Sequence, residues 1–331
     1  MHQHGDVTQR IAFDHHERQA YLLALGAGEE WIAKTAASLR ALPPLGEPMA
    51  FRVPEMWLRR PPARYREDVE ACRRYLRAGH SYEICLTNAV VAECAPEPLE
   101  LYRALRRANP APHSAYLRFG DLAVLSSSPE RFLAVDRERW VESRPIKGTA
   151  GRAAGPAEDA RLAAALAVDS KNRAENVTIV DLVRNDLGRV CEVGSVEVAD
   201  LMRVETYETV HQLVSGVRGR LRPEVTPTEA IRACFPPGSM TGAPKLRTME
   251  IIDELEDEAR GVYSGAIGYL GLGGGCDLSV AIRTIVVDHG RLTVGAGGAI
   301  VADSDSDDEL EEMLLKAHAT LAALGSYSLL G

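Results

Sequence analysis

The sequence predicts an α+β protein of layered, mainly antiparallel β-sheets with helices packed outside. Strand-like runs occur in pairs joined by short turns, as in antiparallel hairpins. Helical stretches come in blocks between these pairs and do not alternate with single strands, which argues against a parallel sheet. No internal repeat is present. With 331 residues, 46% hydrophobic and 26% charged, the composition is that of a globular protein.

Residues 1–60 are predicted to form a short N-terminal segment and linker, and residues 61–331 the main domain. Two short apolar runs, at 11–13 and 20–25, indicate a hairpin. The spacing of Trp31, Ala36 and Leu39 predicts a helix over residues 29–42. Six prolines between residues 43 and 62 indicate a linker without regular structure.

The main domain is expected to open with a helix at residues 65–78, where Val69, Cys72 and Leu76 share one side and Gly79 ends the helix. Further helices are predicted at 98–108, 157–186 (in two pieces), 228–233, 244–256 and 307–324. Strands and hairpins are predicted at 84–93, 117–125, 132–143, 193–221 and 263–301.

Charge and cysteine content exclude several classes of partner. The net charge of −9 argues against a nucleic-acid surface, where lysine and arginine would cluster. Six scattered cysteines lack metal-site spacing, and their apolar surroundings favour buried thiols in a reducing compartment. No apolar run is as long as a membrane span, and the N-terminus lacks the apolar core of a signal peptide. A soluble, cytoplasmic protein is expected.

Three glutamates suggest a metal site. Glu309, Glu312 and Lys316 have helical i, i+3, i+7 spacing and share one face. A solvated charged face would explain that pattern by itself. Glu175, however, falls on an apolar helical stripe, where a lone carboxylate is costly unless it is paired or metal-bound. If the two helices meet, the three carboxylates converge, and Mg²⁺ suits such an oxygen-rich site.

Lys147 lies in the run Arg-Pro-Ile-Lys-Gly-Thr, residues 144–149, where Pro145 and Gly148 indicate that a strand ends and turns into a site. Such a lysine is either a solvated surface amine or a nucleophile. A nucleophilic amine must be unprotonated, and this requires burial or a cationic neighbour such as Arg144. The local sequence leaves both interpretations open.

Two glycine-rich stretches could bind an anion. Phe235–Lys245 opens a helix whose free amides would attract a carboxylate or a phosphate equally well, and its spacing is not that of a Walker loop. Gly295, Gly297 and Gly298 interrupt a strand and would let a ligand approach the backbone. Arg283 would bind a carboxylate or face solvent. These residues together predict an enzyme that acts on a small polyanionic metabolite.

Eight stretches in the same order, spanning residues 62–322, resemble the chorismate-utilising enzymes. They are Ser81–Asn88, Ser126–Arg131, Arg144–Thr149, Arg173–Asn176, Ile179–Arg189, Gly238–Lys245, Tyr263–Ile267 and Ala302–Asp305. Within this family Lys147 resembles the aminodeoxychorismate synthase branch, since anthranilate and salicylate synthases have alanine there. The resemblance implies the layered α+β fold of chorismate-binding enzymes.

The resemblance also implies a mechanism. Lys147 would attack C2 of chorismate while protonated Glu130 helps the C4 hydroxyl to leave. Ammonia from a glutamine amidotransferase partner would then add at C4 and expel the lysine, giving 4-amino-4-deoxychorismate. Burial would keep Glu130 protonated near neutral pH.

The same resemblance implies that Glu175 and Glu312 bind Mg²⁺, with Glu309 nearby, and that the metal holds the ring carboxylate. The substrate-binding residues would be Thr149, Ser239, Thr241, Tyr263, Arg283, Gly297, Gly298, Ala299 and Lys316.

Three departures from the family pattern refine this expectation. Glu83 stands where members that use water have a lysine base, which argues against isochorismate formation. Gln212, with His211 before it, replaces a histidine tied to pyruvate elimination, which favours a product that keeps its enolpyruvyl group. Residues 1–60 are shorter than the family's usual N-terminal half, so that sheet is expected to be reduced. The alternatives are anthranilate synthase component I and a catalytically inactive chorismate-binding homologue.

Overall fold

The structure, a computed structural model, describes residues 8–26 and 28–330. It divides into two compact units, one ending at Glu47 and the other starting at Pro48. The sequence had suggested a boundary after residue 60. Residues 48–60 instead group with the larger unit because strand β3 (Arg52–Leu58) forms there and pairs with strands of that unit.

The smaller unit contains a hairpin and a helix. Strands β1 (Gln9–Asp14) and β2 (Gln19–Ala24) pair antiparallel, with Ile11 opposite Leu22. Helix α1 (Glu29–Arg40) follows. The predicted hairpin and helix are therefore confirmed.

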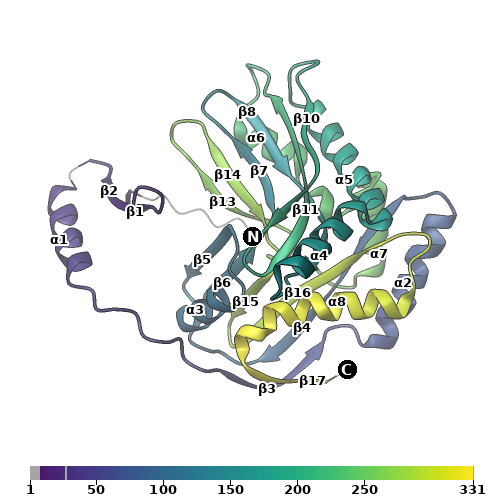
Figure 1. Cartoon of the computed structure of the whole chain (residues 1–331), viewed down its shortest axis with the longest axis horizontal. Coiled ribbons are helices and arrows are strands. Elements are labelled where there is room, and N and C mark those ends of the chain that lie inside the picture. The colour runs from purple at the N-terminus through teal and green to yellow at the C-terminus, as the bar shows by residue number, and fades with distance from the viewer. Residues whose placement is uncertain (1–7, 27, 331) are drawn as a thin grey trace. The chain divides into compact units, whose positions relative to one another are not determined.

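The larger unit contains two sheets and seven α-helices among its described residues (Figure 1). The helices are α2 (Pro62–Arg77), α3 (Pro98–Ala108), α4 (Pro156–Val168), α5 (Ser170–Gly188), α6 (Pro227–Cys234), α7 (Lys245–Leu255) and α8 (Ser306–Leu321). The strands that follow β3 are β4 (Glu83–Glu93), β5 (His113–Phe119), β6 (Leu122–Ser128), β7 (Arg131–Val135), β8 (Trp140–Arg144), β9 (Ile146–Gly151), β10 (Glu197–Thr206), β11 (Val210–Arg220), β12 (Gly242–Ala243), β13 (Ala266–Leu270), β14 (Cys276–Val280), β15 (Thr284–Asp288), β16 (Arg291–Ile300) and β17 (Ser326–Leu330).

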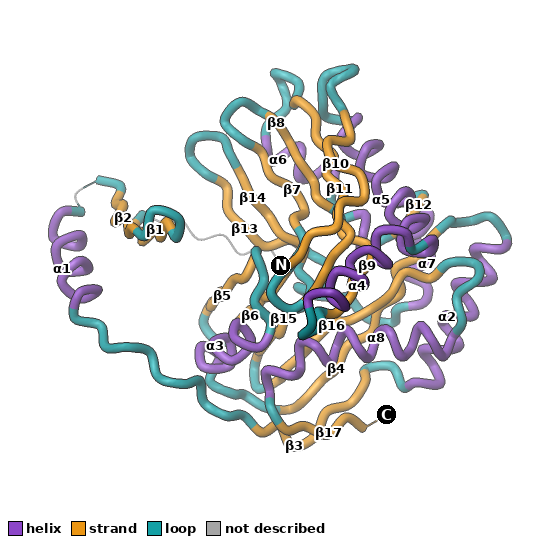
Figure 2. The backbone as a smooth tube through the Cα atoms, viewed as in Figure 1, coloured by secondary structure: helices purple, strands orange, loops and turns teal. Residues whose placement is uncertain are grey.

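The strands of the larger unit gather in two sheets (Figure 2), and most of their pairs are antiparallel. One has the order β10-β11-β8-β7-β14-β13, with β9 also paired to β11. The other has the order β17-β3-β4-β16-β15-β6-β5, with β12 also paired to β4. Only the β17–β3 pair is parallel among the described strands. The predicted α+β class is confirmed.

Four strands escaped prediction: β3, β9, β12 and β17. β3 contains Pro54 and lies in the stretch interpreted as a linker, which was wrong. β9 contains Gly148 and Gly151, so its local composition disfavours a strand. Pairing with distant strands stabilises both segments, and that pairing leaves no local signal.

Each sheet has its own core. Tyr65, Leu86 and Met313 are fully buried between β4, α2 and α8. Leu133 and Ile179 are fully buried between β7 and α5. Each such side chain contributes roughly 1.5–3 kcal/mol through its burial. The two cores hold β4, α5 and α8 in fixed positions, and these elements carry the charged residues described below.

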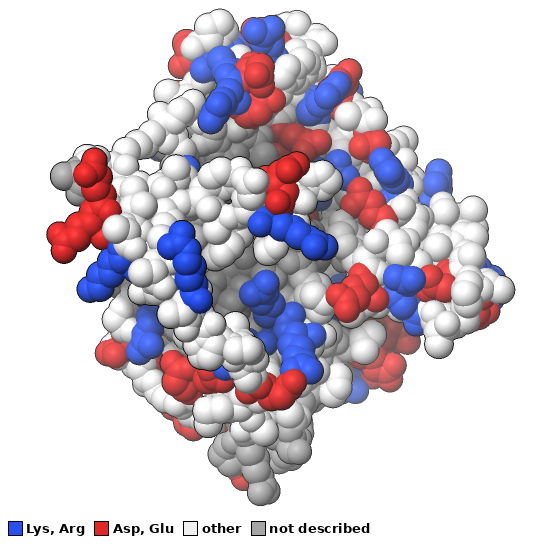
Figure 3. Space-filling model, turned by 60° about the vertical axis from the view of Figure 1, so that its left-hand side comes forward, with Lys and Arg blue, Asp and Glu red and all other residues white. Residues whose placement is uncertain are grey.

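Three further observations concern the surface charge, the cysteines and the length of the helices. On the face shown in Figure 3, basic and acidic side chains are interspersed. The six cysteines are free, and all but the partly buried Cys94 are buried. Across residues 8–26 and 28–330, the helices are too short or too polar to cross a bilayer.

Candidate active site

Lysines and glutamates from four elements meet where β9 lies against α5. β9 pairs with β11, with Thr149 opposite Gln212. Gly148 has φ of 95°, and a Cβ there would lie 2.9 Å from the Asn172 side chain of α5. Glycine at this position therefore lets the helix approach the strand closely. That approach brings Glu175 of α5 to Lys147 of β9.

Lys147 is buried, with 10% of its side chain exposed. Its Nζ lies 2.6 Å from Glu83 Oε1 and 3.9 Å from Glu175 Oε2. Burial lowers the pKa of Lys147, but the two carboxylates outweigh it and raise the pKa well above its ordinary value. The interpretation as a solvated surface amine is therefore wrong. Lys147 is a buried ammonium group in a carboxylate pair.

Arg144 is not the cationic neighbour that the sequence suggested. Its guanidinium pairs with Glu205 and lies within 3.7 Å of Glu142 and 3.6 Å of Asp200. Arg144 ends β8 and Lys147 belongs to β9, so Pro145 and Ile146 separate the two side chains and they turn to different partners. The neighbours of Lys147 are acidic.

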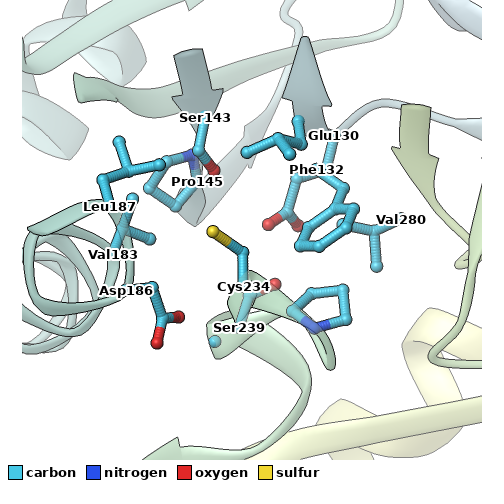
Figure 4. Close-up of a pocket in the computed structure, with 13 residues that line it drawn as sticks. Glu130, Phe132, Ser143, Pro145, Val183, Asp186, Leu187, Cys234, Ser239 and Val280 are labelled. Atoms are coloured by element: carbon cyan, nitrogen blue, oxygen red, sulfur yellow. The ribbon is translucent and has the colours of Figure 1, made fainter. Parts of the chain in front are cut away.

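Glu130 is 5% exposed, at the end of the β6–β7 turn. Burial raises its pKa to about 7, although the Lys147 charge and the Ile146 amide act in the opposite direction. Its carboxyl group points into a cavity of about 20 Å³ that Phe132 also lines (Figure 4). That volume suits one water-sized molecule. A carboxyl group with this pKa can donate a proton near neutral pH.

Each of the three predicted metal ligands faces a lysine. The pairs are Glu175–Lys147 at 3.9 Å, Glu309–Lys171 at 3.7 Å and Glu312–Lys316 at 2.6 Å. Burial raises the pKa of Glu175 and of Glu309. Burial acts the same way on Glu312, but Lys316 outweighs it and lowers that pKa.

These carboxylates match a hard cation in chemistry. Glu309 is 1% exposed, and its Oε2 has no hydrogen-bond partner. A Cβ on Gly298 would lie 3.0 Å from this oxygen, so the glycine leaves space beside it. Within the part of the chain that the structure describes, no three histidine, cysteine or acidic residues are gathered tightly enough to bind a metal. The donor types fit Mg²⁺, and the metal site stays a prediction.

Buried polar atoms without partners concentrate around this site. Among the described residues, the buried side-chain nitrogen and oxygen atoms that lack a hydrogen-bond partner are Glu83 Oε2, Arg139 Nε, Gln212 Oε1, Ser239 Oγ and Glu309 Oε2. All but Arg139 belong to the site or lie directly across from it. Each such atom costs about 1–3 kcal/mol, which a ligand could offset.

Arg283 is a cation without a carboxylate. Its Nη1 donates a 2.9 Å hydrogen bond to the Lys316 carbonyl, and no ion pair among the described residues includes it. Burial lowers the pKa of Arg283. This arrangement fits a group that awaits an anionic ligand.

Two of the three strand glycines serve the protein itself. A Cβ on Gly295 would lie 2.2 Å from the Tyr263 ring, and one on Gly297 would lie 2.5 Å from the Leu86 carbonyl. This close packing explains why glycine stands at both positions, and the expectation that they also admit a ligand stays a prediction. Only Gly298 opens space toward the glutamates.

The loop before α7 is fixed by its own polar groups. Thr241 Oγ1 donates to the carbonyls of Pro237 and Gly238 at 3.2 and 3.3 Å. Lys245 Nζ donates to Asp186 Oδ2 at 2.6 Å and to two loop carbonyls. Thr149 and Ala299, the remaining predicted contacts, lie on β9 and β16, where Thr149 is exposed.

The sequence did not identify Glu83 as the partner of Lys147, nor Lys171 as a member of the site. The partners are 64 residues apart in sequence, so no local spacing could have joined them. The departure from the family pattern at Glu83 was the one available signal.

A family model described as chorismate binding enzyme matches residues 2–322. Aminodeoxychorismate synthases of Streptomyces pristinaespiralis and Streptomyces griseus are 54% and 51% identical over 96% of the chain. The chain spans only 46% of the length of each. Aminodeoxychorismate synthase component 1 of Escherichia coli is 44% identical, covering 78% of the chain and 57% of that protein.

Among solved structures, anthranilate synthase component I from Streptococcus pneumoniae has a TM-score of 0.84 at 34% identity. The match covers 95% of this chain and 72% of that one. The isochorismate synthase MenF of Escherichia coli has a TM-score of 0.76 at 21% identity, covering 93% and 72%, and shares the fold.

Proposed function

The chain belongs to the chorismate-binding enzymes, and we propose that it catalyses the Mg²⁺-dependent amination of chorismate at C4, giving 4-amino-4-deoxychorismate. The observation that carries the proposal is the buried Lys147, whose Nζ lies 2.6 Å from the carboxylate of Glu83. The identity of 54% and 51% to two aminodeoxychorismate synthases supports it. We expect the reaction to occur in the cytoplasm.

Lys147 must first become a neutral amine, and Glu83 Oε1 is the acceptor in contact with it. The amine then forms a bond to C2 while the C4–O bond breaks and the ring double bonds shift. Glu130 gives its proton to the departing hydroxyl, which leaves as water. Ammonia next bonds to C4, the C2–nitrogen bond breaks, and Lys147 returns. The net change replaces the hydroxyl group with an amino group.

Glu175 and Glu312 would hold the Mg²⁺, with Glu309 beside them. Bound there, the ion would supply a positive charge that holds the ring carboxylate. Tyr263, Arg283, Lys316 and the backbone amides from Gly297 to Ala299 would hold the other carboxylate. Thr149, Ser239 and Thr241 would make further contacts with the substrate. We propose that a glutamine amidotransferase subunit delivers the ammonia, in keeping with the component 1 names of relatives.

Anthranilate synthase component I is the alternative enzyme, because one from Streptomyces coelicolor is 41% identical over 95% of the chain. Lys147 favours the C4 product, since a covalent lysine at C2 directs ammonia to C4. An inactive homologue is the remaining alternative. Analysis of the products from chorismate, Mg²⁺ and ammonium separates the three: 4-amino-4-deoxychorismate, anthranilate, or none.

Intact-protein mass spectrometry tests the covalent step. Protein incubated with chorismate and Mg²⁺ but no ammonia should gain the mass of chorismate less one water. Lys147→Ala should gain nothing, whereas Lys34→Ala, a change at an exposed lysine, should behave as wild type. No adduct together with no turnover on added ammonium would overturn the proposal.

A further inference from the structure

Lysine is rare in this chain and gathers at the site. Of 38 basic residues, the sequence has lysine only at 34, 147, 171, 245 and 316, and the other 33 are arginine. Lys147, Lys171 and Lys316 each face a predicted metal ligand. An ammonium group is a compact charge on a flexible stem, whereas arginine grips a carboxylate with a planar fork. Lys171 is the one of the three to which neither the chemistry nor substrate binding gives a role.

Lys171 lies over the three glutamates. It is the second residue of α5 and precedes Glu175 by four residues, so the two share a helix face. Its Nζ is 3.7 Å from Glu309 Oε1, which also accepts a 2.6 Å hydrogen bond from Ser304. Burial lowers the pKa of Lys171, but Glu309, Glu312 and Glu175 outweigh it and raise the pKa. Its charge is therefore directed at the whole cluster.

The contact made by Lys171 is also the easiest of the three to break. Its side chain is 54% exposed, against 10% for Lys147. Lys316 is more firmly held, since it contacts Glu312 at 2.6 Å and the Gly297 carbonyl at 3.1 Å. Because the Lys171 side chain is half-exposed, its ammonium group can return to water at little cost when this 3.7 Å pair separates. The buried Glu309 beneath it, however, needs a cation.

We propose that Lys171 is an internal competitor of the metal ion. In the metal-free protein its ammonium group neutralises Glu309 and its neighbours, and it swings toward solvent when a divalent cation binds. The inference rests on the Mg²⁺ site of the proposed function. The proposal explains why residue 171 is a lysine and not an arginine. An arginine would bind the Glu309 carboxylate through two hydrogen bonds and would be displaced less easily by a metal ion.

Isothermal titration calorimetry of the full chain with Mg²⁺, in the absence of substrate, tests whether Lys171 competes with the metal ion. Lys171→Met should bind Mg²⁺ about tenfold more tightly than wild type, because the competing charge is gone. Lys171→Arg should bind Mg²⁺ more weakly than wild type, although its charge is unchanged. Lys34→Met should match wild type. An unchanged melting temperature would show that each variant is folded.

The arginine variant separates competition from simple repulsion. If charge alone mattered, Lys171→Arg would match wild type, and that result would overturn the proposal. Mg²⁺ binding that is unchanged or weaker in Lys171→Met would also overturn it. No Mg²⁺ binding by any variant would remove this inference and the metal of the proposed function together. The expected affinities without chorismate amination would support the competition and reject the proposed function alone.

Discussion

Two buried lysines of this protein have nearly the same exposure and very different surroundings. The side chains of Lys147 and Lys245 are 10% and 11% exposed, and each Nζ lies 2.6 Å from one carboxylate oxygen. Lys245 also donates to the carbonyls of Cys234 and Pro236 at 2.7 and 2.8 Å, so all three of its protons are used. Among the described residues, the one further ion pair of Lys147 is with Glu175, at 3.9 Å.

Their partners differ in the same way. Glu83, beside Lys147, keeps a second carboxylate oxygen that is buried and has no hydrogen-bond partner. Asp186, beside Lys245, differs from Glu83: among the described residues, neither of its carboxylate oxygens is a buried atom without a hydrogen-bond partner. A complete set of hydrogen bonds marks a lysine that holds a loop. An incomplete set marks a lysine with protons and space left for chemistry.

The largest effect is expected at Lys147. Replacing it by methionine should reduce ammonium-dependent amination at least about 10³-fold, because the nucleophile is lost. The double variant Lys147→Met with Glu83→Gln should recover part of the lost stability, since Glu83 no longer carries a buried charge without its partner, but not activity. Steady-state rates and urea unfolding measure the two effects. Residual turnover near the wild-type rate in either variant would refute a covalent role for Lys147.

Lys245→Met should have the opposite profile. Asp186 would stay buried without its cation, so the free energy of unfolding should fall by about 3–5 kcal/mol. Activity per folded molecule should remain close to wild type. Urea unfolding followed by active-site titration checks both parts, and adding Asp186→Asn should restore much of the stability. A loss of activity with unchanged stability would place Lys245 in the chemistry.

The sequence predicted local elements and site residues better than it predicted the contacts between distant strands. Helix α3 was predicted at its observed bounds, because Pro98 begins an amphipathic run. Local patterns singled out Lys147 and Glu175, and the family resemblance added Glu130. Local patterns and motifs carry such information. They do not carry the pairing of β9 with β11, which puts Lys147 into the space between the sheets.

Side-chain partners were the part that could not be predicted. The choice of Glu83 over Arg144 as the neighbour of Lys147 depends on which face each strand presents after folding. The same applies to Lys171 and Glu309, which are 138 positions apart by their residue numbers. A motif identifies a residue type at a place in the family. The protonation state of that residue, and which of its hydrogen-bonding groups stay unpaired, depend on tertiary contacts.

A smaller effect on the reaction rate is expected from Glu130, whose pKa is shifted by its surroundings. Its pKa is raised to about 7 by burial, so the rate should fall about tenfold per pH unit above that value as the acid loses its proton. The folded-state pKa exceeds the unfolded value of 4.5, so folding favours the protonated form. Its contribution to stability is therefore present below pH 4.5 and is lost as the pH rises through about 7.

Glu130→Gln checks both consequences. The variant should lose the alkaline fall in rate, with activity reduced about 10²-fold at neutral pH. Between pH 5 and 8 its free energy of unfolding should change less than that of wild type. A pH–rate profile and urea unfolding at several pH values are the measurements. An unchanged alkaline limb in the variant would assign that limb to another group.

The smallest effect should come from Gln212, which extends the comparison to a neutral side chain. Gln212 is 5% exposed, and its Oε1 has no hydrogen-bond partner. It belongs to β11 and lies opposite Thr149 of β9, the strand that also carries Lys147. If this vacancy serves a ligand, Gln212→Met should raise the free energy of unfolding of the ligand-free protein by about 1 kcal/mol, because an orphaned acceptor is removed at similar volume. The stabilisation by chorismate in thermal melts should shrink at the same time. A loss of stability without ligand would mean that the carboxamide supports the fold, as Lys245 does, and that an unpaired atom beside β9 is no sign of function.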